Sequence, residues 1–287
     1  METDINVAFV GDVHGSIIPM YEFLAELEHR AGIHIDGVVQ VGDFGIYMPS
    51  DELIKHTSIQ TARFEIRTNF PKLWKGEYAV PMPTWVCPGN HEDYRVLIHL
   101  IGADRHVIHN FHILEDGSIN DVLGLRVGAI WGNYSYKSYR NPTVIEDART
   151  YNTHSRKALH IYEPSVERLM KAGKFDVLVT HDAPKGLLPI VPVAMNSELK
   201  STMGLDEDEL YPGGCPGFLP LYETGQPDVH FFGHFHVNRV MRRTNPRVVC
   251  LHAFNYNAPA SIEVRTYTVE QGEQVNAGTC MSSVQTH

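Results

Sequence analysis

Five short segments of the chain place polar side chains directly after an apolar run. In chain order they are Gly11-Asp12-Val13-His14, Gly42-Asp43, Gly89-Asn90-His91-Glu92, Thr180-His181 and Gly233-His234-Phe235-His236. Glycine often stands directly before the polar residue, which lets the backbone turn sharply. Together the segments supply carboxylate, amide and imidazole groups. This mixture suits two divalent ions such as Mn, Fe, Co, Ni or Zn, and it is too rich in nitrogen for calcium or magnesium alone.

The elements that must position these side chains can be read from hydrophobic patterning. Short apolar runs predict buried strands at 5–10, 37–41, 84–87, 123–130, 175–179, 228–232, 247–254 and 260–269. Helical spacing predicts helices at 17–31, at 51–75, from 91 to about 101, and at 154–172 with an interruption near Pro164. Because ligands gather at the carboxyl ends of strands in α/β folds, we expect the five segments to meet. Alternating elements that become strand-rich favour an α/β sandwich of sheets flanked by helices.

Composition excludes several classes of protein. The 287 residues carry a formal net charge of −10, which disfavours binding to an extended nucleic acid. No run approaches the roughly 18 apolar residues of a membrane span, so we expect no membrane association. None of the 4 cysteines is paired at CxxC spacing, which argues against a zinc ribbon. We therefore expect a cytoplasmic protein.

The chain is expected to form a single domain over residues 1–275. Within it, residues 183–227 are rich in proline and glycine, and we expect a lid-like insert there. Residues 276–287 are small and polar, and we expect them to form a disordered tail.

The five segments, in this order and each at a predicted strand end, resemble the calcineurin-like metallophosphoesterase family. The resemblance implies a four-layer α/β/β/α sandwich of two mixed sheets flanked by helices. It also implies two metal ions, with manganese favoured. The implied ligands are Asp12, His14 and His236 for one ion, Asn90, His181 and His234 for the other, and Asp43 as a bridge between them.

The same resemblance implies the chemistry. A hydroxide bridging the two ions would attack phosphorus in line, because paired metals lower the pKa of a shared water. His91 would be catalytic, facing the substrate phosphate and protonating the leaving oxygen or stabilising the transition state. Glu92 or Asp93 could orient a histidine from behind, and the sequence does not decide between them.

Among branches of the family, the RNA lariat debranching enzyme is similar over several segments. These are Gly42-Asp43-Phe44, 89–92, 125–132 and 180–186. That branch has cysteine where this chain has Asp12, so the chain resembles the ordinary two-metal version. Phosphoprotein phosphatases continue differently after the second Gly-Asp. We therefore expect a hydrolase of phosphate esters, with phosphodiesters slightly favoured and a small molecule or nucleotide as substrate.

Three residues are candidates for substrate binding, namely Tyr136, Tyr139 and Arg140. Tyrosine can stack on a base and arginine can hold a phosphate. Such tyrosines can equally be half-buried structural residues. Two alternative functions also stay open: a phosphomonoesterase acting on small metabolites or phosphoproteins, and a non-catalytic scaffold on the same fold.

Overall fold

The structure, a computed structural model, describes residues 2–48, 67–102, 105–150, 156–186, 214–241, 244–254, 262–270 and 281–285. One sheet contains β1 (Glu2–Val10), β2 (Gly37–Gln40), β3 (Thr84–Val86), β4 (Phe111–Ile113), β11 (Ile262–Glu270) and β12 (Met281–Gln285). Its strand order is β12-β11-β1-β2-β3-β4. Strands β1 to β4 are parallel, while β11 is antiparallel to both of its neighbours. The first sheet is therefore mixed.

The second sheet is also mixed. It contains β5 (Ser118–Val122), β6 (Leu125–Ile130), β7 (Val177–Thr180), β8 (Val229–Phe232), β9 (Arg239–Met241) and β10 (Arg247–Cys250). Its order is β5-β6-β7-β8-β10-β9. The four central strands run parallel, and the two edge strands β5 and β9 are antiparallel to their neighbours.

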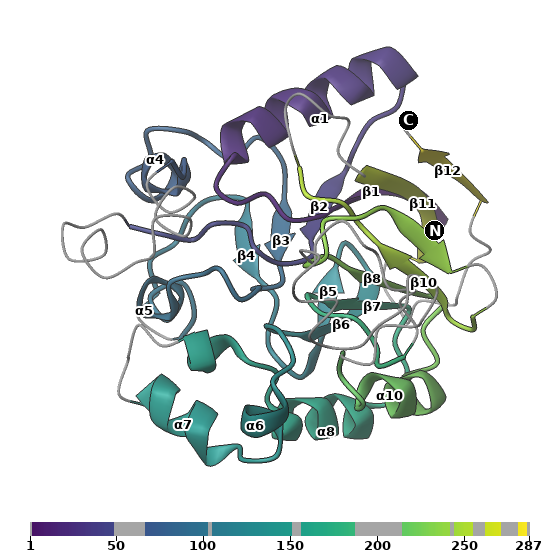
Figure 1. The fold of residues 1–287 in the computed structure, drawn as a ribbon. Helices are drawn as coiled ribbons and strands as arrows, with labels where there is room; N and C mark the ends of the chain where they lie inside the picture. Colours follow the sequence, from purple (N-terminus) through teal and green to yellow (C-terminus); the bar gives the residue numbers. More distant parts are fainter. Residues whose placement is uncertain are drawn as a thin grey trace, which may run out of the picture.

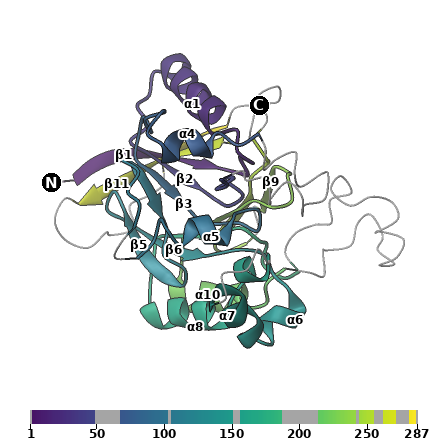
Figure 2. The same cartoon turned by 90° about the vertical axis from the view of Figure 1, so that its left-hand side faces the viewer.

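Helices cover the outer faces of the two sheets. The longest is α1 (Ile17–Ala31), which lies above the first sheet, whereas α8 (Glu163–Ala172) and α10 (Phe218–Gly225) lie below the second (Figures 1 and 2). The shorter helices are α4 (Phe70–Trp74), α5 (Tyr94–Leu97), α6 (Tyr136–Tyr139), α7 (Thr143–Thr150) and the 3-10 helix η1 (Arg156–Leu159). The predicted four-layer α/β/β/α sandwich is confirmed. Within the described ranges, none of the helices combines the length and apolar character that a bilayer crossing requires.

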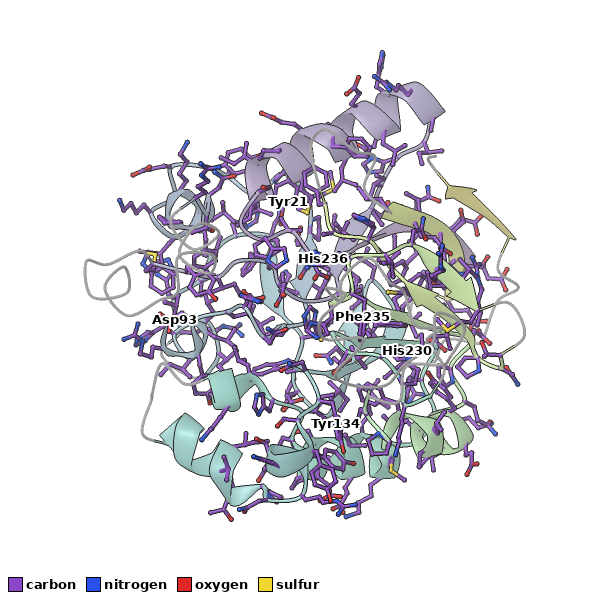
Figure 3. The ribbon with its side chains drawn as sticks, viewed as in Figure 1. Tyr21, Asp93, Tyr134, His230, Phe235 and His236 are labelled. Atoms are coloured by element: carbon purple, nitrogen blue, oxygen red, sulfur yellow. The ribbon has the colours of Figure 1, made fainter. Side chains whose placement is uncertain are left out.

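The hydrophobic core fills the space between the sheets. Strands β2, β7 and β8 are buried along their whole length, as expected for parallel strands covered on both faces. Phe9 of β1 stacks on Phe231 of β8 with ring centroids 4.0 Å apart, which joins the two sheets directly. On the outer side, α1 carries Tyr21 (Figure 3). The Tyr21 hydroxyl donates to Thr84 Oγ1 at 2.8 Å.

Several elements differ from the prediction. The strand expected from Leu123 begins at Leu125, because Leu123 and Gly124 both have positive φ, at 56° and 93°, and form the turn between β5 and β6. The short strands β4, β5 and β9 and the helix α10 were not predicted. Strand β12 lies inside the segment expected to be a disordered tail and pairs with β11.

Two other expectations fall partly outside the described residues. For the helix expected at 51–75, residues 49–66 are outside, and α4 is the described part. For the insert expected at 183–227, residues 187–213 are outside, and α10 packs against α8. The described residues on either side of 187–213 lie close together, because the Cys215 amide donates to the Ala183 carbonyl at 2.9 Å. The lid and the single domain over 1–275 stay predictions.

Candidate metal centre

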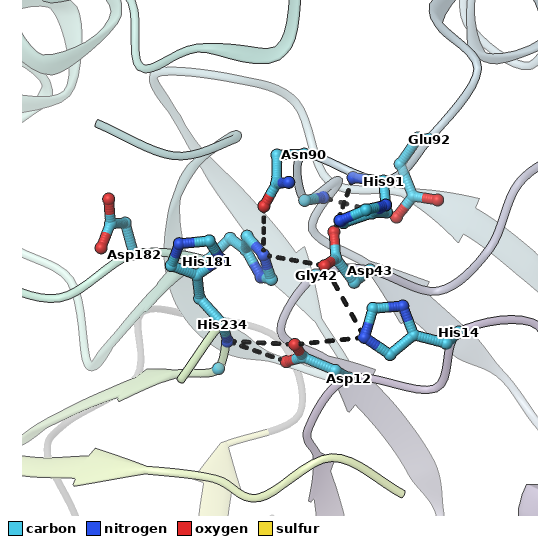
Figure 4. Close-up of polar contacts among 12 residues, drawn as sticks. Asp12, His14, Gly42, Asp43, Asn90, His91, Glu92, His181, Asp182 and His234 are labelled. Carbon is cyan, nitrogen blue, oxygen red and sulfur yellow. Dashed lines mark hydrogen bonds and ion pairs between the residues drawn. The ribbon is translucent and has the colours of Figure 1, made fainter. Parts of the chain in front are cut away.

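All five predicted segments meet at one edge of the sandwich (Figure 4). Asp12, Asp43 and Asn90 follow β1, β2 and β3 of the first sheet. His181 follows β7 of the second sheet, and the pair His234 and His236 follows β8. Because these strands run parallel within each sheet, their carboxyl ends lie side by side, as the α/β rule predicts.

Glycines in the segments leave room for ligands from neighbouring loops. A Cβ on Gly233 would lie 2.0 Å from Asp12 Oδ1, and one on Gly89 would lie 2.3 Å from Asp43 Oδ1. A Cβ on Gly42 would lie 2.1 Å from His181 Nδ1. Of these three glycines, only Gly42 has a positive φ, at 107°, so only there does a sharp backbone turn explain the glycine. Gly89 and Gly233 are needed for close approach, which the sequence argument from backbone turning did not foresee.

The first group of donors comprises Asp12, His14 and His236. His236 Nε2 lies 3.0 Å from Asp12 Oδ2 and 2.9 Å from His14 Nε2. His14 Nε2 lies 3.7 Å from Asp12 Oδ2. Asp12 also accepts the backbone N–H of His234 at 2.9 Å, which ties β1 to the loop after β8.

The second group comprises Asp43, His181 and His234, with Asn90 beside them. His181 Nε2 lies 3.3 Å from Asp43 Oδ2 and 3.0 Å from Asn90 Oδ1. His181 Nδ1 donates to the Val41 carbonyl at 3.1 Å, which leaves Nε2 to face the donors. Asp43 Oδ2 is also 3.9 Å from His14 Nε2, so Asp43 stands between the two groups.

These spacings fit metal coordination. Two donors about 2.1 Å from one ion, at the angles of tetrahedral or octahedral sites, lie about 3.0–3.4 Å apart. The separations of 3.0 Å between His236 and Asp12 and 3.3 Å between His181 and Asp43 fall within that range, and the 2.9 Å between His14 and His236 lies just below it. Nitrogen and oxygen donors in each group suit borderline divalent ions.

The electrostatics of the centre also favour cations. Asp12 and Asp43 are 0% and 1% exposed, and buried carboxylates require a compensating positive charge. Burial alone would raise the pKa of Asp43, but His181, His91 and His14 together hold that pKa well below its usual range. Burial would lower the pKa of His181, but Asp43 and Asp12 raise it to about 10. A proton therefore occupies His181 in the absence of metal, and ligation by a neutral imidazole would release it.

A family model described as calcineurin-like phosphoesterase matches residues 5–238. The chain belongs to this family. The lariat debranching enzyme of Danio rerio is 26% identical over 236 residues, covering 81% of this chain and 40% of that protein. The Homo sapiens enzyme is 25% identical over 237 residues, covering 81% of this chain and 42% of that protein. The chain thus spans about two fifths of the length of these relatives.

Solved structures that match the chain include GAP50, the anchor in the inner membrane complex of Plasmodium. It matches with a TM-score of 0.45 at 12% sequence identity, over 98% of this chain and 88% of that one.

In this phosphoesterase, His91 lies beside the first donor group without belonging to either group. Its backbone N–H donates to Asp43 Oδ1 at 2.7 Å. Its ring centroid lies 5.5 Å from that of His14 in an edge-to-face arrangement. Its role as a catalytic residue rather than a ligand stays a proposal.

The two acidic residues that could orient a histidine both accept backbone N–H groups, and a role in orienting a histidine stays a prediction. The Glu92 carboxylate accepts backbone N–H groups of the loop after β2, and Asp93 caps α5 by accepting from the Arg95 N–H at 3.0 Å. Burial, reinforced by the charge of Asp43, raises the pKa of Glu92 to about 7. The Glu92 contacts cross 46 to 48 positions of sequence, so local pattern could not reveal them.

Two further residues of the phosphoesterase support the centre and were given no role from sequence. Asp182 accepts the Tyr134 N–H at 2.6 Å. Desolvation lowers the pKa of His234, and the charge of Asp182 opposes part of that shift. The buried amide of Gln40 donates to the carbonyls of Gly11 and Gly42, which joins the ends of β1 and β2. Each lies at or next to the predicted end of a strand, and that position is the feature of the sequence that could have suggested a supporting role.

The three candidate substrate residues are placed differently from one another. Tyr136 is 57% exposed, and the guanidinium of Arg140 lies over its ring at 4.3 Å from the centroid. Tyr139 is 9% exposed and belongs to the hydrophobic cluster beneath the second sheet. Its ring packs against Tyr134 with centroids 5.4 Å apart. Tyr139 is therefore a buried structural residue, whereas Tyr136 and Arg140 form a pair on the surface.

Proposed function

We propose that this phosphoesterase uses two divalent ions to hydrolyse phosphate esters, with phosphodiesters slightly favoured over monoesters. The observation that carries the proposal is the pair of converging donor groups, with Asp43 between them. When bound, the two ions would polarise a phosphoryl oxygen and activate water for attack on phosphorus. Asp12, His14 and His236 would hold one ion, and Asn90, His181 and His234 the other.

The residues of the chain itself have distinct tasks in this proposal. His91, fixed through its backbone to Asp43, donates a proton to the leaving oxygen or stabilises charge on the phosphoryl group. Tyr136 and Arg140 offer an exposed ring beside a guanidinium, which suits a base next to a phosphate. We withdraw Tyr139 as a base-stacking residue because its ring is buried.

The preference for diesters is supported by two observations. The curated relatives are named as lariat debranching enzymes, although they match this chain over less than half of their own length. The surface pair of Tyr136 and Arg140 has the composition of a nucleotide contact. The net charge of −10 disfavours an extended nucleic acid, so we propose a nucleotide or another small phosphate ester.

The test compares a chromogenic phosphodiester with the matching monoester. The protein is stripped of metal and reloaded with Mn²⁺, the ion we propose, and Asp43→Asn serves as the blank. Faster diester cleavage supports the proposal. Faster monoester cleavage overturns the diester preference and makes the chain a phosphatase. No cleavage of either ester, with both ions bound, overturns hydrolysis of simple esters and favours a scaffold.

A cytoplasmic location is also a proposal. It is supported by Cys87, Cys215 and Cys250, which are buried free thiols, as expected in a reducing compartment.

A further inference from the structure

The Glu92 carboxylate lies buried behind the metal centre and receives three consecutive backbone N–H groups. They belong to Phe44, Gly45 and Ile46, at 2.8, 2.9 and 2.8 Å. Glu92 is only 6% exposed, so little water can reach its carboxylate to replace these hydrogen bonds. Successive N–H groups that converge on one anion form a concave binding site for negative charge.

The loop held by Glu92 carries Asp43, which stands between the two donor groups. Asp43 has a φ of 55° and Gly45 a φ of 93°, both in the left-handed region. For Asp43 this conformation is strained and persists only if the surroundings hold it. Bonds to the next three residues supply that restraint immediately after the ligand.

The same loop also holds the segment that carries His14. The Asp43 carbonyl accepts the His14 N–H at 2.7 Å, and the Phe44 carbonyl accepts the Gly15 N–H at 2.9 Å. His14 has a φ of 46° and is therefore strained as well. Glu92 thus supports His14 indirectly, because it holds the 44–46 backbone and that loop in turn accepts the N–H groups of His14 and Gly15. Glu92 also follows Asn90, a donor of the second group, by two positions.

We propose that Glu92 is a positioning residue for the metal centre. Its carboxylate holds the 44–46 backbone and thereby sets Asp43 directly, and His14 indirectly, in the geometry that binds metal. Glu92 touches neither the substrate nor an ion. The inference rests on the proposed metal-binding role of these ligands, and it concerns how the protein prepares them.

Both carboxylate oxygens of Glu92 are needed as acceptors for this role. Glu92→Gln keeps the size but replaces one oxygen by an NH₂ group. That group would point a donor at backbone donors, so at least one of the N–H groups of residues 44–46 would lose its acceptor. Glu92→Asp keeps the charge but shortens the reach by one methylene, and should recover part of the effect.

The first experiment is hydrogen–deuterium exchange of residues 43–48 in the metal-free protein. Wild type should protect the amides of Phe44, Gly45 and Ile46, and fast exchange there would overturn the proposal without any variant. In Glu92→Gln these amides should exchange about tenfold faster, as expected for loss of a buried hydrogen bond. Unchanged exchange in Glu92→Gln would equally overturn it.

The second experiment titrates Mn²⁺ into wild type, Glu92→Gln and a matched control. The control is Glu263→Gln, which alters another buried glutamate, 3% exposed and paired with Arg265 on β11. Glu92→Gln should weaken Mn²⁺ binding by about 10–100-fold, the usual effect of removing support behind ligands. Glu263→Gln should lower the melting temperature but leave Mn²⁺ affinity within about twofold.

These outcomes are separable from the proposed hydrolysis. Equal loss of Mn²⁺ affinity in both variants would mean a general stability effect and would overturn the positioning role. If wild type binds Mn²⁺ and Glu92→Gln binds it weakly, the inference stands even when neither ester is cleaved. In that case only the proposed function fails.

Discussion

Gly233→Ala should remove the first metal ion while leaving the fold intact. The added Cβ would lie 2.0 Å from Asp12 Oδ1, whereas Cβ atoms essentially never approach another heavy atom closer than 3.0 Å. Asp12 or the loop after β8 must therefore move by at least about 1 Å, in an interior with few voids. Gly233 does not have the positive φ that would make alanine strained, so the effect is one of space.

The magnitude follows from the size of that displacement. A shift of about 1 Å at a reacting centre costs roughly 10²-fold in rate, and disturbed ligand support costs about 10–100-fold in metal affinity. Isothermal titration with Mn²⁺ should therefore show one tight site in Gly233→Ala where wild type shows two. Gly89→Ala, whose Cβ would lie 2.3 Å from Asp43 Oδ1, should weaken both sites, because Asp43 stands between them.

The matched control is Gly32→Ala at the end of α1. Gly32 has a φ of 64°, and no heavy atom lies within 4 Å of its added Cβ. This variant should lose about 1–2 kcal/mol of stability from backbone strain and should bind two equivalents of Mn²⁺. Two sites of wild-type affinity in Gly233→Ala would refute the reasoning, because Asp12 would then not be a ligand in the position described.

Three further predictions concern catalysis, pH and packing. Asp43→Asn and His91→Ala should each lower kcat on a phosphodiester at least about 100-fold, and His91→Ala should still bind both ions, which equilibrium dialysis can check. Burial lowers the pKa of His230 to about 3, so the folded state resists protonation that the unfolded state accepts near pH 6.5. His230 therefore contributes stability that is present above pH 6.5 and is lost as pH falls below it. Metal-free wild type should lose about 2 kcal/mol more than His230→Gln between pH 7 and pH 5 in urea denaturation, and parallel losses would contradict this. Phe9→Ala should destabilise the protein by about 3–5 kcal/mol in the same assay, since Phe9 is fully buried against Phe231.

The sequence predicts the central elements well because burial leaves a clear pattern. Strands β2, β7 and β8 are covered on both faces and read as continuous apolar runs. Edge strands lack that pattern. β4 and β9 have three residues each, and most residues of β5 are half-exposed. Their place depends on neighbouring strands, which local periodicity does not report.

The ligand candidates were accessible from sequence because they share one local design, a polar residue after a buried strand. The structure brings all seven together, with Asp43 between the groups as the family resemblance implies. The support around them was not accessible. Glu92 contacts residues 44–46 across more than 40 positions, and Gln40 joins two loops from within β2. Such contacts follow from the packing of the sheets.

The packing between the sheets is itself part of the metal centre. Phe9 precedes Asp12 by three residues on β1, and Phe231 precedes His234 by three residues on β8. Their rings stack at 4.0 Å, and beyond them the Asp12 carboxylate accepts the His234 N–H at 2.9 Å. Because the two sheets each supply only part of every donor group, the distance between them sets the distance between ligands. The aromatic stack therefore helps to set the spacing between Asp12 and His236, which we propose share an ion.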